Sequence, residues 1–122
     1  MRVVVLLSTA VLVVASAAGA SVQRGTLVGV VTRGPITPVC ALEQPCDEPA
    51  AHVTLVFVRN GVVTGRVTTD SAGRYRVALP GGSYSVRRAK AAAPDRRLDP
   101  RMVRVRPRVK LRIDFSIDTG IR

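Results

Sequence analysis

The residues with the most obvious chemical potential stand at the end of the sequence. Asp118-Thr119-Gly120 follows an apolar stretch, and aspartic proteases present a catalytic carboxylate in such a tripeptide. Two copies of a small chain could each supply one aspartate to a pair that shares a proton. An aspartic protease, however, builds a flap and supporting strands after the tripeptide, and here two residues follow it. We therefore expect an ordinary Asp–Thr–Gly turn that closes the last strand.

His52 is the single histidine, and a histidine can act as a general base. Base catalysis would require a nucleophile and an orienting acid around it. No serine stands in the sequence context of a nucleophile elbow. We expect His52 to lie at the start of a strand without a catalytic role, and we predict that the protein is not an enzyme.

Basic residues are the second chemical feature. The net charge is +11, with 17 arginines and two lysines. Such a protein can bind polyanions, although an arginine-biased genome would produce the same composition. The candidate anion-binding residues alternate with apolar residues in the last two expected strands and are Arg104, Arg106, Lys110 and Arg112. They form one continuous stripe if those two strands pair. Asp114 and Asp118 interrupt the stripe, so specific nucleic-acid binding is not expected.

The first 20 residues predict a secretory signal peptide. Arg2 precedes an apolar run from Val3 to Val14, and cleavage sites of the Ala-x-Ala type end at Ala17 or Ala20. The alternative is a transmembrane anchor, but a membrane span needs about 20 apolar residues. We expect residues 21–122 to form one mature domain without a transmembrane segment. The expected location is secreted, periplasmic or in the cell envelope.

Cys40 and Cys46 are expected to form a disulfide, because two cysteines of an exported chain usually pair. Closing so short a loop contributes about 2 kcal/mol in the chain-entropy model. The alternative is a metal site that adds His52 and Asp47 to the two cysteines. Structural zinc requires four good ligands at tight spacings. We therefore favour the disulfide and predict neither a metal nor another cofactor.

The remainder reads as short strands separated by turns. Seven strands are expected, at residues 25–35, 52–61, 62–70, 74–79, 83–88, 101–107 and 108–118. The second has apolar residues on both faces and should be central, and Gly65 in the third suggests a bulge. Residues 36–51 should form a stapled loop, and residues 89–100 a linker. This pattern predicts an all-β, seven-stranded sandwich of the Ig-like or prealbumin-like class after an N-terminal signal helix.

The last expected strand has the most regular alternation of the chain. In residues 108–118, every second side chain is apolar: Val109, Leu111, Ile113, Phe115 and Ile117. Such alternation indicates one buried face and one solvated face. We expect these five side chains to face the core.

The segment 68–86, "TTDSAGRYRVALPGGSYSV", resembles the core motif of carboxypeptidase regulatory-like domains, whose fold is transthyretin-like. The matching positions are Thr69, Asp70, Gly73, Arg74, Tyr75, Val77, Leu79, Pro80, Gly82, Tyr84 and Val86. The segment departs from the motif at Gly81, and residues 49–53 depart from the usual start of the second strand. With its flanks, the resemblance extends over about residues 25–122 and is closest to small exported bacterial proteins. It implies no catalytic residue, since in metallocarboxypeptidases the zinc ligands lie in a separate domain.

Two functions are consistent with these features. The first is a non-catalytic exported β-sandwich that acts as an interaction or structural module of the cell envelope or medium. The second is a polyanion-binding protein that uses the arginine stripe. The expected partner is accordingly an envelope protein or an anionic polymer.

Overall fold

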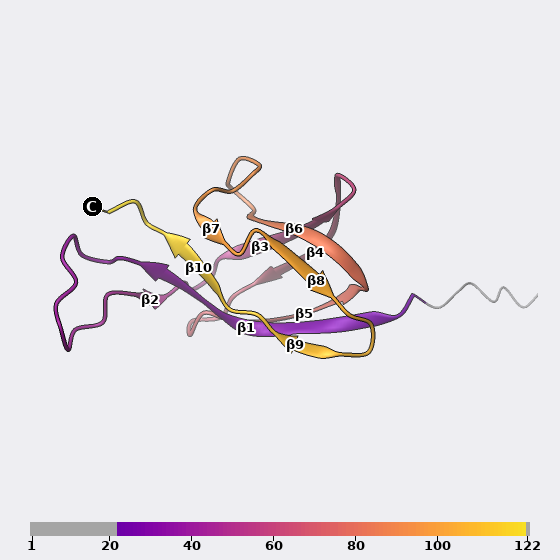
Figure 1. Ribbon diagram of the computed structural model, residues 1–122, viewed down its shortest axis with the longest axis horizontal. Coiled ribbons are helices and arrows are strands. Elements are labelled where there is room, and N and C mark those ends of the chain that lie inside the picture. The colour runs from indigo at the N-terminus through magenta and orange to yellow at the C-terminus, as the bar shows by residue number, and fades with distance from the viewer. Residues whose placement is uncertain (1–21, 122) are drawn as a thin grey trace, which may run out of the picture.

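The computed structural model describes residues 22–121, which form two β-sheets packed face to face (Figure 1). The expected N-terminal signal helix and the cleavage sites lie outside the described residues. The ten strands are β1 (Arg24–Gly34), β2 (Glu48–Pro49), β3 (Thr54–Arg59), β4 (Val62–Thr68), β5 (Arg74–Pro80), β6 (Gly82–Arg88), β7 (Leu98–Asp99), β8 (Met102–Val105), β9 (Lys110–Arg112) and β10 (Phe115–Asp118). The all-β sandwich class is confirmed.

The strand count exceeds the expected seven for two reasons. β2 and β7 are pairs of residues within the segments expected as a loop and a linker. The last expected strand is divided into β9 and β10. The other six expected strands are present.

One sheet is organised around β1, the longest strand. β5 pairs antiparallel with one edge of β1, and β9 and β10 pair parallel with the other. β2 and β7 extend this sheet at the end where β1 finishes. The second sheet has the order β4-β3-β6-β8, and Figure 1 shows it as the upper layer above β1 and β5.

The β3 and β4 pair confirms two local expectations. β3 lies between β4 and β6, and its residues Leu55, Val56 and Phe57 are all buried, as expected for a central strand. The register shifts beside Gly65, because Phe57 pairs with Gly65 whereas Val58 pairs with Val63. The extra residue of β4 forms the bulge that Gly65 suggested.

The two sheets enclose one hydrophobic core. Its buried side chains come from alternate positions of the strands and include Leu27, Val31, Leu55, Phe57, Tyr75, Val77, Leu79, Tyr84, Val86, Leu98, Val103, Val105, Phe115 and Ile117. The rings of Tyr75 and Phe115 lie 5.5 Å apart between centroids. In β5, β6 and β8, buried and exposed residues alternate, as a half-buried strand requires.

The expectation for residues 108–118 is partly wrong. The whole segment follows β1 in one register, with Leu111 beside Leu27 and Phe115 beside Val31. Only its second half is buried, since Leu111 remains 38% exposed and Val109 44% exposed. The reason is the facing sheet, which ends with β8 packed over β1. β9 lies beyond that cover, so the apolar side chains there are only partly covered.

The interruption between β9 and β10 has a chemical cause. Continuing the ladder would direct the Val30 amide to the Ile113 carbonyl. Instead the Tyr75 hydroxyl donates to that carbonyl, and the Val30 amide donates to the Asp114 carboxylate at 2.9 Å. This hydrogen bond lowers the pKa of Asp114, with a further contribution from Arg112. Burial raises the pKa of Tyr75, so its hydroxyl stays protonated as the donor.

Candidate functional site

The Asp118-Thr119-Gly120 tripeptide forms the expected turn. The Gly120 amide donates to Asp118 Oδ1 at 2.9 Å, an Asx turn that uses the carboxylate as a backbone partner. Gly120 has a φ of 78°, in the left-handed region that favours glycine. The Arg97 guanidinium donates to the Thr119 carbonyl at 2.8 Å. The aspartate and the glycine thus have defined structural roles in reversing the chain after β10.

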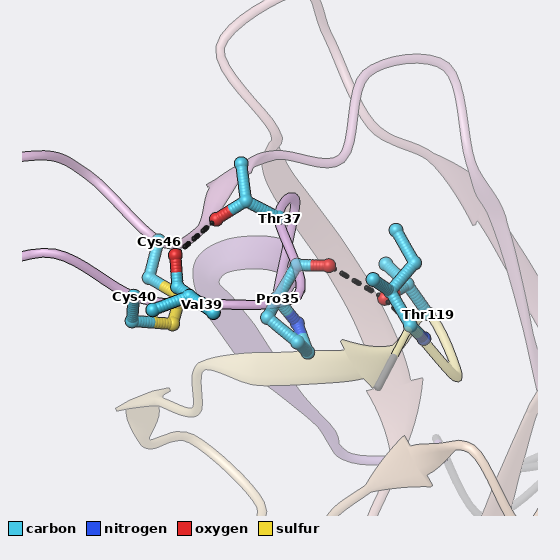
Figure 2. The surroundings of a disulfide bond; sticks show 7 residues. Pro35, Thr37, Val39, Cys40, Cys46 and Thr119 are labelled. Atoms are coloured by element: carbon cyan, nitrogen blue, oxygen red, sulfur yellow. Dashed lines mark hydrogen bonds between the residues drawn. A yellow bond between two sulfur atoms is a disulfide. The ribbon is translucent and has the colours of Figure 1, made fainter.

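Thr119 links this turn to the end of β1. Its amide donates to the Gly34 carbonyl at 3.0 Å, and its hydroxyl donates to the Pro35 carbonyl at 2.7 Å. Figure 2 shows this hydroxyl contact beside the loop that follows Pro35. The turn therefore fastens the last strand to the base of the cysteine loop.

The cysteine loop is closed by a disulfide between Cys40 and Cys46, as the sequence predicted. Their Cα atoms lie 5.4 Å apart (Figure 2). The loop base is also joined by the Ile36 amide, which donates to the Cys46 carbonyl at 2.7 Å. Most of the loop is exposed, including Val39 and Leu42. Together with the hydrogen bond between Ile36 and Cys46, the disulfide closes the exposed segment into a loop.

Replacing Thr119 with valine should loosen the C-terminal turn while leaving the sandwich folded. The variant loses the hydroxyl donor to Pro35, at a cost of about 1 kcal/mol. Amide hydrogen exchange at Thr119 and Gly120 should accelerate. Thr37→Val is the matched control, because the Thr37 hydroxyl donates to Val39 within the same loop. Equal exchange at the turn in both variants would contradict the role assigned to Thr119.

The alternative metal site is not formed by the cysteines. Their sulfurs are bonded to each other, so neither can act as a thiolate ligand. His52 is exposed in the turn before β3 with a φ of 57°, and its amide donates to Thr69. Among residues 22–121, no three His, Cys, Asp or Glu side chains are grouped in a way that could hold a metal ion.

The resemblance motif forms a tight connection between β4 and β5. Asp70 Oδ1 accepts hydrogen bonds from the amides of Ala72 and Arg74, each at 2.9 Å, and Gly73 has a φ of 75°. The buried Thr69 hydroxyl accepts from the Val53 amide and donates to the Ala50 carbonyl. These residues therefore position the chain at the start of β3 as well as the β4–β5 turn.

A buried ion pair that the sequence did not indicate closes the segment 89–97. Asp95 is 3% exposed, and its carboxylate accepts from Arg88 Nε at 2.7 Å and Nη2 at 2.9 Å. The amides of Arg88 and Arg97 donate to the same carboxylate. Hydrogen bonding to Arg88 lowers the pKa of Asp95 despite the opposing effect of burial. In the sequence, an aspartate among alanines and arginines carried no signal of burial.

The four candidate anion-binding residues do not share one sheet. Arg104 lies on β8, opposite Ser83 of β6. Lys110 and Arg112 lie on β9, opposite Thr26 and Val28 of β1. Because β8 and β9 do not pair, the condition for one continuous stripe fails. All four residues are exposed, with Arg106 in the connection between the two strands, and anion binding by them remains a prediction.

The pairing of β1 brings together arginines that were not selected from the sequence. Arg74 and Arg76 lie on the exposed face of β5, opposite Val30 and Val28 of β1. Their outward parity was visible in the alternation of residues 74–79. Their proximity to β9 was not visible, because it depends on β1 lying between the two strands.

Comparisons with known proteins show the fold. No protein-family model matches the chain, and no curated protein matches it significantly. The TIE protein of Bacillus anthracis is similar in structure, with a TM-score of 0.50 and 17% identity over 79% of this chain and 16% of that one. The minor pilin GBS52 of Streptococcus agalactiae has a TM-score of 0.48 and 15% identity over 79% of this chain and 44% of that one. The chain thus spans less than half the length of these neighbours.

Proposed function

We propose that the protein is a non-catalytic, exported β-sandwich of the carboxypeptidase regulatory-like type. It acts as an interaction or structural module of the cell envelope or medium, and its partner is an envelope protein or polymer. The motif at residues 68–86 supports the family, since Asp70 and Gly73 build the β4–β5 turn. Within residues 22–121, no helix has the length and hydrophobicity of a membrane span.

The observation that carries this proposal is that four aspartate carboxylates bind backbone amides. Asp70, Asp95, Asp114 and Asp118 each accept a hydrogen bond from a backbone amide. A carboxylate bound in this way holds the local backbone in place. These four aspartates therefore support turns, a strand interruption and a linker, which are structural tasks.

Export can be tested by expressing the full sequence with a C-terminal tag in a bacterium. We expect the tagged chain outside the cytoplasm, cut after Ala17 or Ala20, with a mass that matches the oxidised cysteine pair. Intact mass spectrometry of each cell fraction measures both properties. A full-length, reduced chain retained in the cytoplasm would overturn the proposal.

Anion binding is the second candidate function, and the net charge of +11 favours it. Retention on an immobilised polyanion above physiological salt is the expected result. If the protein elutes below that salt concentration, this second function fails, and the first is unaffected.

A further inference from the structure

On the exposed face of strands β5, β1 and β9, short side chains of β1 lie between two rows of longer side chains. β1 occupies the centre, and its outward side chains between Thr26 and Val30 are short. The flanking strands β5 and β9 carry long basic side chains that are in register with these residues of β1. Arg76 and Arg112 are both in register with Val28, and Lys110 is in register with Thr26. This arrangement forms a trough along β1 with basic walls, here called the β1 trough.

A shallow hollow shows that Arg74 and Arg112 border the same space. It measures about 220 Å³ and is lined by Val28, Gly29, Val30, Arg74, Tyr75 and Arg112. Arg74 and Arg112 come from opposite sides of β1, so both side chains border the floor made by the two valines. Neighbouring strands are about 4.8 Å apart, which places the two walls about 10 Å apart.

The charge of the trough is strongly positive. Arg74, Arg76, Lys110 and Arg112 form its walls, and Arg24 lies at one end, opposite Pro80. Asp114 borders the other end, where Arg112 contacts it at 3.3 Å. The Asp70 carboxylate is occupied by the amides of its own turn. A ligand in the trough would therefore meet a surplus of cations on both sides.

We propose that the β1 trough binds a single linear phosphodiester polymer, with phosphates contacted from both walls. This proposal rests on the second candidate function, anion binding. It places the site in the β1 trough instead of the expected stripe of Arg104, Arg106, Lys110 and Arg112. Three of the four wall residues are arginines, whose planar fork matches phosphate in a bidentate way. Along each strand, outward side chains recur about every 6.8 Å, which lets successive cations follow an extended chain.

The chemistry of the face argues for a polymer without bases. All four aromatic side chains of the protein are buried: Phe57, Tyr75, Tyr84 and Phe115. Single-stranded nucleic acids gain about 1–3 kcal/mol per base by stacking on exposed aromatic rings, and none is available here. A membrane surface is flat and would reach the arginine tips but not the recessed valines. A narrow polyol phosphate chain fits between the walls.

The test is titration of a fluorescent poly(glycerol phosphate) oligomer with the mature protein at several salt concentrations. We expect binding by the wild type and a loss of at least about tenfold in Arg76→Ser/Arg112→Ser. The log–log salt slope should fall by about 0.7 for each arginine removed. Arg104→Ser/Arg106→Ser is the matched control, because it removes the same charge from exposed positions outside the trough. Circular dichroism confirms that the variants are folded.

Each outcome has a distinct meaning. If both double variants weaken binding equally, the trough proposal is wrong, while anion binding as a function survives. If the wild type does not bind the oligomer, the trough proposal fails, and retention on the immobilised polyanion decides the second function separately. Tighter binding of single-stranded DNA or phosphatidylglycerol vesicles than of the oligomer would also overturn the proposal. As a second variant, Arg76→Lys/Arg112→Lys keeps the charge but removes the guanidinium fork, and it should bind between the wild type and the serine variant.

Discussion

Gly29→Ala should lower the free energy of unfolding by about 3 kcal/mol, one of the two largest effects expected in this chain. A Cβ atom at Gly29 would lie 2.0 Å from the Ile113 carbonyl oxygen and 2.9 Å from Asp114 Oδ1. The carbonyl belongs to the backbone and cannot rotate away as a side chain would. It also accepts the Tyr75 hydrogen bond that crosses Gly29 from β5. The substitution would therefore disturb the interruption between β9 and β10 together with its hydroxyl donor.

Chemical denaturation of the mature protein, followed by far-ultraviolet circular dichroism, measures this effect. Gly61→Ala is the control, because a Cβ atom at Gly61 meets nothing within 4 Å. Its cost should be limited to the strain of a φ of 75°, about 1 kcal/mol. If the two variants were equally stable, the close approach of Ile113 to Gly29 would be refuted.

Asp95→Asn should destabilise the protein by about 3 kcal/mol, at the lower end of the cost of breaking a buried ion pair. The neutral amide cannot balance the Arg88 guanidinium, whose side chain is only 29% exposed. The amide also presents one acceptor oxygen where the carboxylate uses two, so the backbone amide of either Arg88 or Arg97 loses its partner. The 89–97 segment should detach from the end of β6.

Glu48→Gln provides the comparison for this ion pair. Arg33 and Glu48 are also 2.7 Å apart, but their side chains are 49% and 43% exposed. Because solvent screens an exposed pair, its loss should cost under about 1 kcal/mol. Equal effects of the two substitutions would show that burial does not determine the strength of the Asp95 pair.

The same pair predicts a pH dependence of stability. The pKa of Asp95 is lower in the folded protein than the usual value of about 4. Its contribution is therefore complete above pH 4–5 and is lost as the pH falls through the lowered folded value. The difference in unfolding free energy between the wild type and Asp95→Asn should shrink on acidification below about pH 4. A difference that stays constant from neutral to strongly acidic pH would argue against an ionised Asp95.

Strand periodicity and turn chemistry were sufficient to predict the sandwich. The alternation of Tyr75, Val77 and Leu79 predicts the core face of β5 from sequence, because successive side chains of a strand point to opposite sides. The residue types of Asp70 and Gly73 predict the turn before β5, because the hydrogen bonds and the positive φ of this turn are local. The disulfide followed from the presence of two cysteines in a sequence with a predicted export signal.

Alternation failed in the last segment, where burial depends on the opposite sheet. Val109 and Leu111 follow the same pattern as Phe115 and Ile117, yet only the latter pair is covered. No local property distinguishes the two halves of the segment. The difference arises because the second sheet ends at β8, and the order of its strands is a long-range property.

For the candidate site too, some features depend on local sequence and others on long-range strand pairing. The sequence by itself determined six of the seven expected strands, the turns, the disulfide and which arginines point outward. Strands and turns follow from local sterics and period-two alternation. Only the tertiary structure decided which arginines are neighbours. Strand pairing joins Arg76 to Arg112 across Val28 and separates Arg104 from Lys110. The tertiary structure also places Asp95 beside Arg88. It joins the Asp118-Thr119-Gly120 turn to the end of β1 through a hydrogen bond of Thr119.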